Sequence, residues 1–300
     1  MVDYIDQHKD RFGVEPICDV LPIAPSTYFD HKDKQRNPEK RSARAKRDEA
    51  LKPEIQRVWS ENFKVYGARK VWLQLNREDI VVARCTVARL MKDLGIQGVR
   101  RGKKTITTMA DLSTARPRDA VNREFTASRP NALWVADLTY VATWSGFAYV
   151  AFVIDAYARR IVGWRVLNSL KTDITLDALE QALHDRNVEQ EALIHHSDRG
   201  VQYVSIKYSE RLAEVGITAS VGSVGDSYDN ALAETINGLY KTELIRQQGP
   251  WKNLDQVEIA TLRWVDWFNN RRLLESIGDV PPAEKESMYY QQQEGSAEAA

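Results

Sequence analysis

Three apolar segments follow one another after Pro130, and they restrict the fold more than any other stretch of the chain. They read ALWVADLTYVAT, GFAYVAFVIDAY and RRIVGWRVLNS, and all three are rich in Val, Ile, Tyr and Trp. Branched and aromatic side chains favour strands, and the WSG between the first two segments is a turn signal. The three segments therefore predict an antiparallel unit of three strands.

The chain after this unit alternates between helical and strand patterns. An amphipathic helix is expected over residues 172–187, and a short buried strand is expected over 192–197. The later elements are a helix at 206–215, an edge strand at 217–221, and long helices at 231–247 and 255–270. This order of strands and helices is typical of an α/β domain, and the last dozen residues are expected to fray.

Basic residues are concentrated in the part of the chain before these strands. Residues 31–130 contain 25 Lys or Arg against 12 Asp or Glu, although the whole chain has 42 residues of each sign. Two short clusters, KRSARAKR at 40–47 and RRGKK at 100–104, contribute to this excess. The excess favours contact with a polyanion such as DNA, and a merely solvated surface is the alternative.

Residues 53–98 have the periodicity of several short helices. Val58 recurs at helical spacing with Ile55, and Leu75 does so with Val71. NREDIVV then resembles the turn of a helix-turn-helix, and three-helix packing without DNA contact is the alternative. The side chains expected on the exposed side of the second helix are Arg84, Thr86, Arg89 and Lys92.

The composition shifts along the chain predict five regions. They are a helical N-terminal segment with a basic linker (1–50), a helix-turn-helix-like domain (51–105), a linker (106–129), an α/β core (130–248) and a C-terminal helical extension with a tail (249–300). No apolar run approaches the roughly 18 residues needed to cross a bilayer, and the first residues lack the apolar stretch of a signal peptide. We therefore expect a cytoplasmic protein with no membrane partner.

Three acidic residues arise from three separate elements of the expected core. Asp137 lies inside the apolar strand WVADLTYV, Asp198 directly follows the strand LIHHS, and Glu234 lies near the start of the helix after SYDN. Each pair of carboxylates about 4 Å apart would repel by roughly 4 kcal/mol at an effective dielectric near 20. Divalent cations such as Mg²⁺ or Mn²⁺ would remove this repulsion, and two such ions can assist phosphoryl transfer. Three unrelated surface acids are the alternative.

The helix of Glu234 has further polar residues on the same face. Asn230, Asn237 and Lys241 lie four residues before, three after and seven after Glu234, so all of them share its side of the helix. Lys241 can reach a phosphate from this face, and a solvated lysine is the alternative. Tyr228, in the glycine-rich loop before the helix, is a candidate for stacking on a base.

At these residues the chain resembles the transposases of bacterial insertion sequences, which share the core of retroviral integrases. WVADLTY, HHSDRGVQY and SYDNALAETINGLYKTELI resemble the three acidic boxes of that family, and 35 residues separate Asp198 from Glu234. YGARKVWLQLNRE with TVARLMKDLGIQG is similar to its helix-turn-helix. The resemblance implies a ribonuclease H-like core, with a mixed sheet and flanking helices, behind a helix-turn-helix domain. It also implies that Asp137, Asp198 and Glu234 bind two Mg²⁺ ions, and that water and then a DNA 3′-hydroxyl attack the phosphodiester.

Within this family, the chain most resembles OrfB, the downstream-frame product of two-frame elements. It implies partners that include the element ends and target DNA, other copies of the chain on DNA, and the upstream-frame product or a fusion protein. The residues expected to contact DNA are Lys241, Asn230, Tyr228, Arg69, Lys70, Arg84, Thr86, Arg89, Lys92, Arg100, Arg101, Lys103 and Lys104. A catalytically inactive regulator and a structure-selective nuclease are the rival functions.

Cysteine and histidine residues give no second metal site. Cys18 and Cys85 have no CxxC partner, and His8 and His31 do not complete a zinc module with Cys18. His195 and His196 border Asp198, but neighbouring residues of a strand point to opposite faces, so at most one can face the acids. We expect a structural or DNA-contacting role for them.

Overall fold

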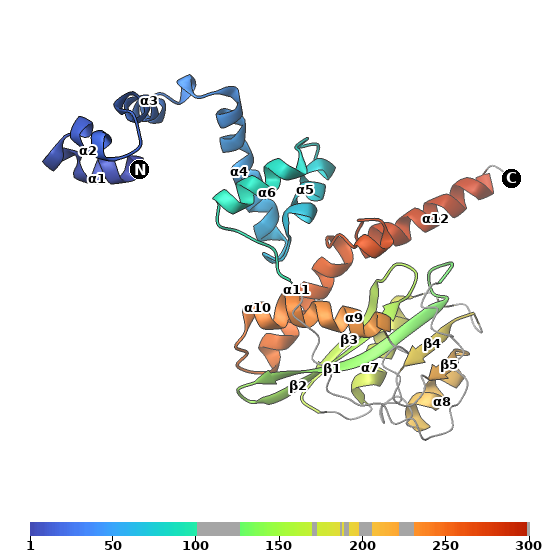
Figure 1. Ribbon diagram of the computed structural model, residues 1–300. Coiled ribbons are helices and arrows are strands. Elements are labelled where there is room, and N and C mark those ends of the chain that lie inside the picture. The colour runs from blue at the N-terminus through green and yellow to red at the C-terminus, as the bar shows by residue number, and fades with distance from the viewer. Residues whose placement is uncertain are drawn as a thin grey trace, which may run out of the picture.

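The computed structural model describes residues 1–100, 127–169, 173–186, 188, 192–197, 206–221 and 231–298. Figure 1 shows three parts of the chain: a small helical group at the N-terminus, a three-helix unit, and an α/β core joined to C-terminal helices. The core contains Asp137 and Glu234, and the three-helix unit lies beside it. The predicted fold class, a mixed sheet with flanking helices behind a helical domain, is confirmed.

The core sheet has five strands in the order β3-β2-β1-β4-β5. Strands β1 (Leu133–Thr143), β2 (Gly146–Asp155) and β3 (Ile161–Leu167) form the predicted antiparallel unit. Strands β4 (Ile194–Ser197) and β5 (Thr218–Val221) continue the sheet on the other side of β1, and both pairings there are parallel. Strand β1 is therefore central, with partners on both edges.

Side chains alternate across β1 and divide the core into two apolar layers. Trp134 and Ala136 pack with α7 (Asp173–Asp185) and α8 (Ile206–Glu214). Leu133 and Val135 belong to the other layer, which includes α9 (Ala231–Tyr240) and α11 (Leu254–Asn270). Figure 1 shows the orange helices α9 and α11 along one side of the green strands. Asp137 continues the odd-numbered series and lies on the α9 side.

Strand β3 packs unusually closely against α7 at Gly163. A Cβ added at Gly163 would lie 2.0 Å from the carbonyl oxygen of Ala178 and 3.0 Å from Cβ of Ala182. The backbone of α7 cannot withdraw without opening the apolar layer around Leu179, which is fully buried.

We therefore expect Gly163→Ala to lower the free energy of unfolding by about 2–3 kcal/mol, because overpacking forces backbone shifts. Gly295→Ala in α12 (Pro282–Glu298) is the matched control, since no atom lies within 4 Å of its added Cβ. The control should change stability by less than about 1 kcal/mol and in the stabilising direction. Urea unfolding followed by circular dichroism measures both, and equal effects of the two substitutions would contradict the close packing.

The three-helix unit consists of α4 (Ala43–Glu61), α5 (Ala68–Arg77) and α6 (Arg84–Asp93). Helix α4 begins earlier than the pattern indicated, because the Ser42 hydroxyl accepts a hydrogen bond from the Ala45 amide and caps it. It runs across residues 50 and 51, where the sequence predicts a boundary, and it contains Pro53. The predicted basic linker is thus partly the first half of α4.

The three-helix unit is joined to the C-terminal region by a polar and aromatic seam. The Asn62 side-chain oxygen accepts a hydrogen bond of 2.9 Å from the Trp267 indole, and the Phe63 and Trp267 ring centroids are 4.9 Å apart. The Tyr66 hydroxyl accepts a hydrogen bond of 2.8 Å from the Leu273 amide. Because these residues are also part of the apolar layer that contains α9 and α11, the unit and the core share one packed interior.

The C-terminal region contains a π-helical turn η2 (Lys241–Ile245), α10 (Arg246–Gln248), a 3₁₀ turn η3 (Glu275–Ile277) and α12. Helix α12 extends to Glu298, so the expectation that the last dozen residues fray was wrong. Glu286 near its start is buried and forms ion pairs with Arg160 and Arg186 of the core, which tether the helix.

The N-terminal helices form a separate small group. They are α1 (Val2–Phe12), α2 (Val14–Val20) and α3 (Pro25–Arg36), followed by the 3₁₀ turn η1 (Pro38–Lys40). Their interior contains Ile5, Ile17, Cys18 and Tyr28, and Figure 1 shows them away from the core. Among the residues that the structure describes, no helix is both long and apolar enough to span a membrane.

Candidate active site

Asp137 lies at the middle of the central strand, where the sequence placed it, and it is only partly buried. Its Oδ1 accepts a hydrogen bond of 2.8 Å from the Leu138 amide, and its Oδ2 accepts one of 2.8 Å from the Asn237 side-chain amide. Both donors are neutral. These two hydrogen bonds orient the carboxylate but do not neutralise its charge. A carboxylate that binds a cation needs both properties.

Helix α9 brings Glu234 to the same side of the sheet. Asn237, which donates to Asp137, lies three residues after Glu234 on this helix, so the two side chains share one face. Glu234 is partly exposed, whereas Asn237 is buried. The hydrogen bond from Asn237 ties this face of α9 to β1.

Lys241 extends this face by one further turn. Its ammonium lies 5.0 Å from the ring centroid of Tyr140 on β1. Burial lowers the pKa of Lys241, the negative charge of Asp137 acts in the opposite direction, and the positive charge of Arg246 lowers it further. Lys241 is thus a half-buried cation over a ring of β1, and the charge of Asp137 acts on it.

Asp198 lies outside the described residues, but its strand is described up to the preceding residue. Strand β4 ends at Ser197, and Ser197 is the register partner of Ala136 in the parallel pairing with β1. The residues that directly precede Asp198 and Asp137 in the chain are therefore neighbours in the sheet.

The oxygen donors of this face fit a hard divalent cation. Asp137 and Glu234 supply carboxylates, and the buried Oδ1 of Asn237 has no hydrogen-bond partner among the described residues. All-oxygen donor sets select Mg²⁺, Mn²⁺ or Ca²⁺ over softer metals. Within the described ranges no group of three metal-ligating side chains is present, and Asp198 is not among the residues searched.

The two histidines before Asp198 are buried on opposite faces of β4. The Tyr208 hydroxyl and Nε2 of His195 are hydrogen-bonded at 3.1 Å, and burial lowers the pKa of His195 to about 4. Nδ1 of His196 is hydrogen-bonded at 3.0 Å to the Ser220 hydroxyl of β5. Both contacts are internal to the core, which favours a structural role for both histidines.

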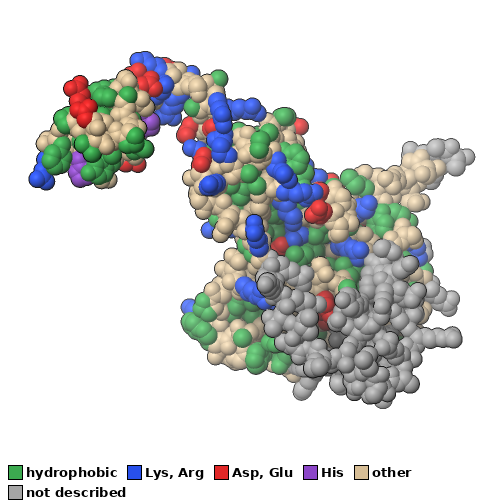
Figure 2. Space-filling view, viewed as in Figure 1, with side chains coloured by type: hydrophobic (Ala, Val, Ile, Leu, Met, Phe, Trp, Pro, Cys, Tyr) green, Lys and Arg blue, Asp and Glu red, His purple; other side chains and the backbone are tan. Residues whose placement is uncertain are grey.

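Helix α6, the third helix of the three-helix unit, carries several of the predicted DNA contacts. Arg84 and Lys92 of α6 are exposed, and Thr86 is half-buried. Arg89 donates to Asp48 of α4 at 2.8 Å, so its charge is balanced within the chain. Figure 2 shows blue Lys and Arg side chains along the three-helix unit down to its junction with the core.

Other predicted DNA contacts have different surroundings. The Arg69 guanidinium donates to both oxygens of Asp279, at 2.8 and 2.6 Å, and so joins the three-helix unit to the C-terminal region. Lys70 lies 5.3 Å from the ring centroid of Tyr66, and burial lowers its pKa to about 8. These contacts explain Arg69 and Lys70 without DNA, whereas Arg100 is exposed. Outside the described residues lie Tyr228, Asn230, Arg101, Lys103 and Lys104.

The comparisons with known proteins agree with both parts of this arrangement. The family model described as "Integrase core domain" matches residues 127–227, and a second model with the same description matches residues 215–282. The model described as "HTH-like domain" matches residues 46–104. The transposase of insertion sequence element IS629 from Shigella sonnei is 58% identical over 290 residues, which cover 97% of each chain. The chain belongs to the insertion-sequence transposases.

A second relative also matches over nearly its whole length. A putative transposase of element IS986/IS6110 from Mycobacterium tuberculosis is 61% identical over 92% of this chain and 99% of its own length. Among solved structures, the catalytic core of HTLV-2 integrase in complex with magnesium aligns at 18% identity with a TM-score of 0.42. That alignment covers 51% of this chain and 95% of that core.

Membership in the family defines the activity in general terms. The transposase is a polynucleotidyl transferase that acts in DNA transposition, and DNA is its substrate. Enzymes with an integrase core domain use divalent metal ions. The family does not by itself assign roles to individual residues. Four exposed cations near the core were not predicted from the sequence, and they are Lys64, Arg246, Lys252 and Arg263. They are scattered along the chain and form no motif, so only tertiary structure could group them.

Proposed function

We propose that Asp137, Asp198 and Glu234 are the catalytic acids, and that they hold two Mg²⁺ ions, with Mn²⁺ as a substitute. The observation that carries this proposal is the hydrogen bond from Asn237 to Asp137, since it brings the helix of Glu234 onto the strand of Asp137. The register of β1 and β4 supports the inclusion of Asp198. Ions bound there would supply activation of an attacking oxygen and stabilisation of the leaving oxygen in phosphoryl transfer.

The side chains around these acids have separate tasks in the proposed reaction. The Asn237 side chain donates a hydrogen bond of 2.8 Å to one oxygen of Asp137, and the Leu138 amide donates one to the other oxygen. The carboxylate therefore cannot rotate freely. Lys241 places a positive charge beside the same carboxylate, where it would attract the scissile phosphate of the element end. Water and then a DNA 3′-hydroxyl would attack at this face, and no protein nucleophile takes part.

The three-helix unit would grip the element end. Arg84 and Lys92 are exposed on α6, Thr86 on the same helix is half-buried, and exposed Arg100 lies beyond the helix, which supports this proposal. We propose that these residues contact DNA, with Tyr228, Asn230, Arg101, Lys103 and Lys104 as further contacts. Copies of the chain would act together on DNA, alone or with the upstream-frame product.

A strand-joining assay tests the proposed reaction. The full chain is given a pre-cleaved duplex element end and a target duplex, with Mg²⁺, with Mn²⁺, or with a chelator. We expect joined product with either metal and none with the chelator, because like charges would then remain uncompensated at the acids. Hydrolysis of DNA without any joined product would favour a structure-selective nuclease, and DNA binding without either reaction would favour an inactive regulator.

A further inference from the structure

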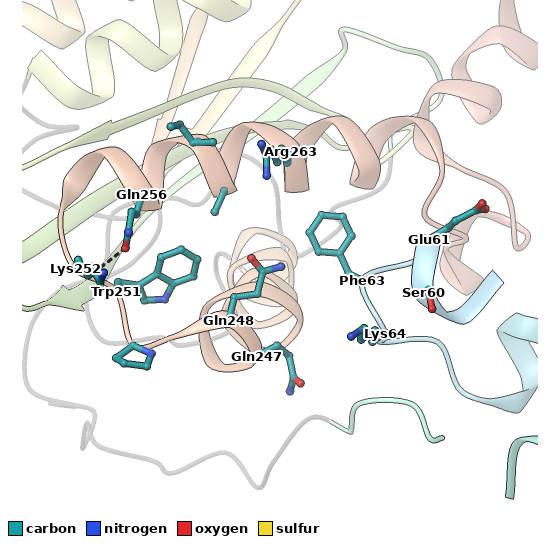
Figure 3. A pocket seen from close by; sticks show the side chains of 13 residues that line it. Ser60, Glu61, Phe63, Lys64, Gln247, Gln248, Trp251, Lys252, Gln256 and Arg263 are labelled. Atoms are coloured by element: carbon teal, nitrogen blue, oxygen red, sulfur yellow. Dashed lines mark hydrogen bonds between the residues drawn. The ribbon is translucent and has the colours of Figure 1, made fainter. Parts of the chain in front are cut away.

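A groove of about 810 Å³ separates the end of α4 from α10 and the first half of α11. Figure 3 shows Lys64 and Phe63 on one side of it, facing Gln247, Gln248 and Trp251 on the other. Its lining combines polar and apolar side chains. The side chains that matter for its chemistry are Lys64, Gln247, Gln248, Lys252, Gln256 and Arg263.

The groove contains three exposed cations, one of which, Lys64, also lies 5.7 Å from the ring centroid of Trp59. Lys64, Lys252 and Arg263 are exposed, and none of them forms an ion pair with a described residue. The groove also contains Glu61, but Glu61 already pairs with Arg57 at 3.1 Å. Three uncompensated positive charges therefore face one hollow, which attracts an anionic ligand.

The groove continues toward α6 through two adjoining hollows. A hollow of about 500 Å³ shares Lys64 and Gln247 with the groove and adds Arg100. A third, of about 580 Å³, shares Arg100 with the second and adds Lys92 of α6. A row of exposed cations thus leads from the helix-turn-helix to the groove.

The row also continues toward the candidate acids. Gln247 and Gln248 of the groove belong to α10, which begins at Arg246. Arg246 is exposed, and it directly follows the π-helical turn η2, which begins at Lys241. Lys241 in turn lies 5.0 Å from the ring centroid of Tyr140, which follows Asp137 by three residues on β1. One path of positive charge therefore connects α6 with the acids.

The aromatic side chains of the groove are already engaged in packing. Trp251 is buried, and its indole donates a hydrogen bond of 3.0 Å to the Ile245 carbonyl. Phe63 packs on Trp267, with ring centroids 4.9 Å apart. Trp251 is buried and Phe63 is partly buried, so the exposed groups of the groove are chiefly Lys, Arg and Gln side chains, which bind phosphates without reading sequence.

We propose that this groove binds the phosphate backbone of duplex DNA that runs from α6 to the acids. The proposal rests on the proposed function, because it assumes that the element end is held by α6 while its terminus reaches Asp137. It adds a DNA contact that lies outside the helix-turn-helix and outside the acidic site. The contact is independent of base sequence.

The test compares two charge-matched variants of the full chain. The groove variant is Lys252→Ala with Arg263→Ala, and the control is Lys285→Ala with Arg271→Ala, which removes one Lys and one Arg elsewhere. Arg271 lines a different hollow, in which Glu61, Glu78 and Glu284 also lie, and Lys285 packs over the ring of Tyr157. Binding to a duplex of about 30 base pairs with an element end is measured without metal over a range of salt concentrations.

We expect the groove variant to reduce the slope of log K against log salt by about 1.8, since each lost phosphate contact removes about 0.9. Affinity near 0.1 M salt should fall by at least about tenfold, and the control should stay within about twofold of the unaltered chain. Unchanged melting temperatures would show that both variants fold. Lys252→Glu with Arg263→Glu should weaken binding further.

Equal slopes for the groove variant and the control would overturn the proposal. A loss confined to single-stranded DNA of the same length would also overturn it, because the proposal commits to a duplex. Since binding is measured without metal, the result does not depend on the acids. A failure of the proposed function would appear instead as joined product from chains that lack Asp137 or Glu234.

Discussion

Asp137→Asn and Glu234→Gln, tested separately, are each expected to reduce strand joining by about 10³-fold or more while DNA binding stays within about twofold. Both substitutions keep the size of the side chain and remove its negative charge. Asparagine at 137 can still accept the hydrogen bond from the Leu138 amide, so β1 should be undisturbed. The charge, and with it the affinity for Mg²⁺, is lost from the face that α9 and β1 share.

The matched control for this experiment is Glu258→Gln on α11. Glu258 is partly exposed and lies 3.8 Å from Arg165, a separation at which a surface ion pair contributes about 1 kcal/mol or less. Joining activity of the control should equal that of the unaltered chain. Activity within tenfold of normal in either site variant would exclude that residue from catalysis, and a matching fall in melting temperature would point to misfolding instead.

The core could be predicted from sequence because its signals are local. The Val, Ile, Tyr and Trp content of residues 132–169 predicts three strands, and the turn at WSG indicates that the first two pair antiparallel. Asp137 was informative because a carboxylate inside an apolar strand needs a partner, and the structure provides one in Asn237. The spacing of Glu234, Asn237 and Lys241 predicted a shared face because a helix repeats every 3.6 residues.

The contacts between distant segments could not be predicted in the same way. Arg69 looked like a DNA contact because it stands in a basic helical region, yet it binds Asp279, 210 residues later. Lys64 and Arg263 line one groove although almost 200 residues separate them. Such pairs depend on how the three-helix unit docks onto the core. Docking is determined by side-chain packing over the whole seam, and no local pattern encodes it.

The same seam contains the ion pair with the largest expected effect on stability. The Arg272 guanidinium donates to both carboxylate oxygens of Glu243, at 2.8 and 2.5 Å, and the two side chains are only 4% and 9% exposed. Arg272 also lies 5.6 Å from the ring centroid of Phe268. We expect Arg272→Ala to lower the free energy of unfolding by about 3–5 kcal/mol, because Glu243 would be left buried without its counter-charge.

A double substitution separates the ion pair from simple loss of packing. Arg272→Met with Glu243→Leu leaves no uncompensated charge, so it should be less destabilising than Arg272→Ala alone, by at least about 2 kcal/mol. Urea unfolding of the three proteins measures this difference. A double variant as unstable as Arg272→Ala would show that packing of the guanidinium, rather than the buried charge of Glu243, dominates.

The position of Glu243 also links this pair to the proposed active site. Glu243 lies in the π-helical turn η2, two residues after Lys241, and π-helical turns often occur at functional sites. Arg272 anchors this turn from the seam, so its removal should loosen Lys241 as well. We therefore expect Arg272→Ala to reduce strand joining even at a temperature where the variant is folded, whereas the double variant should retain more activity. Full activity of folded Arg272→Ala would show that Lys241 is positioned by Tyr140 and α9 alone.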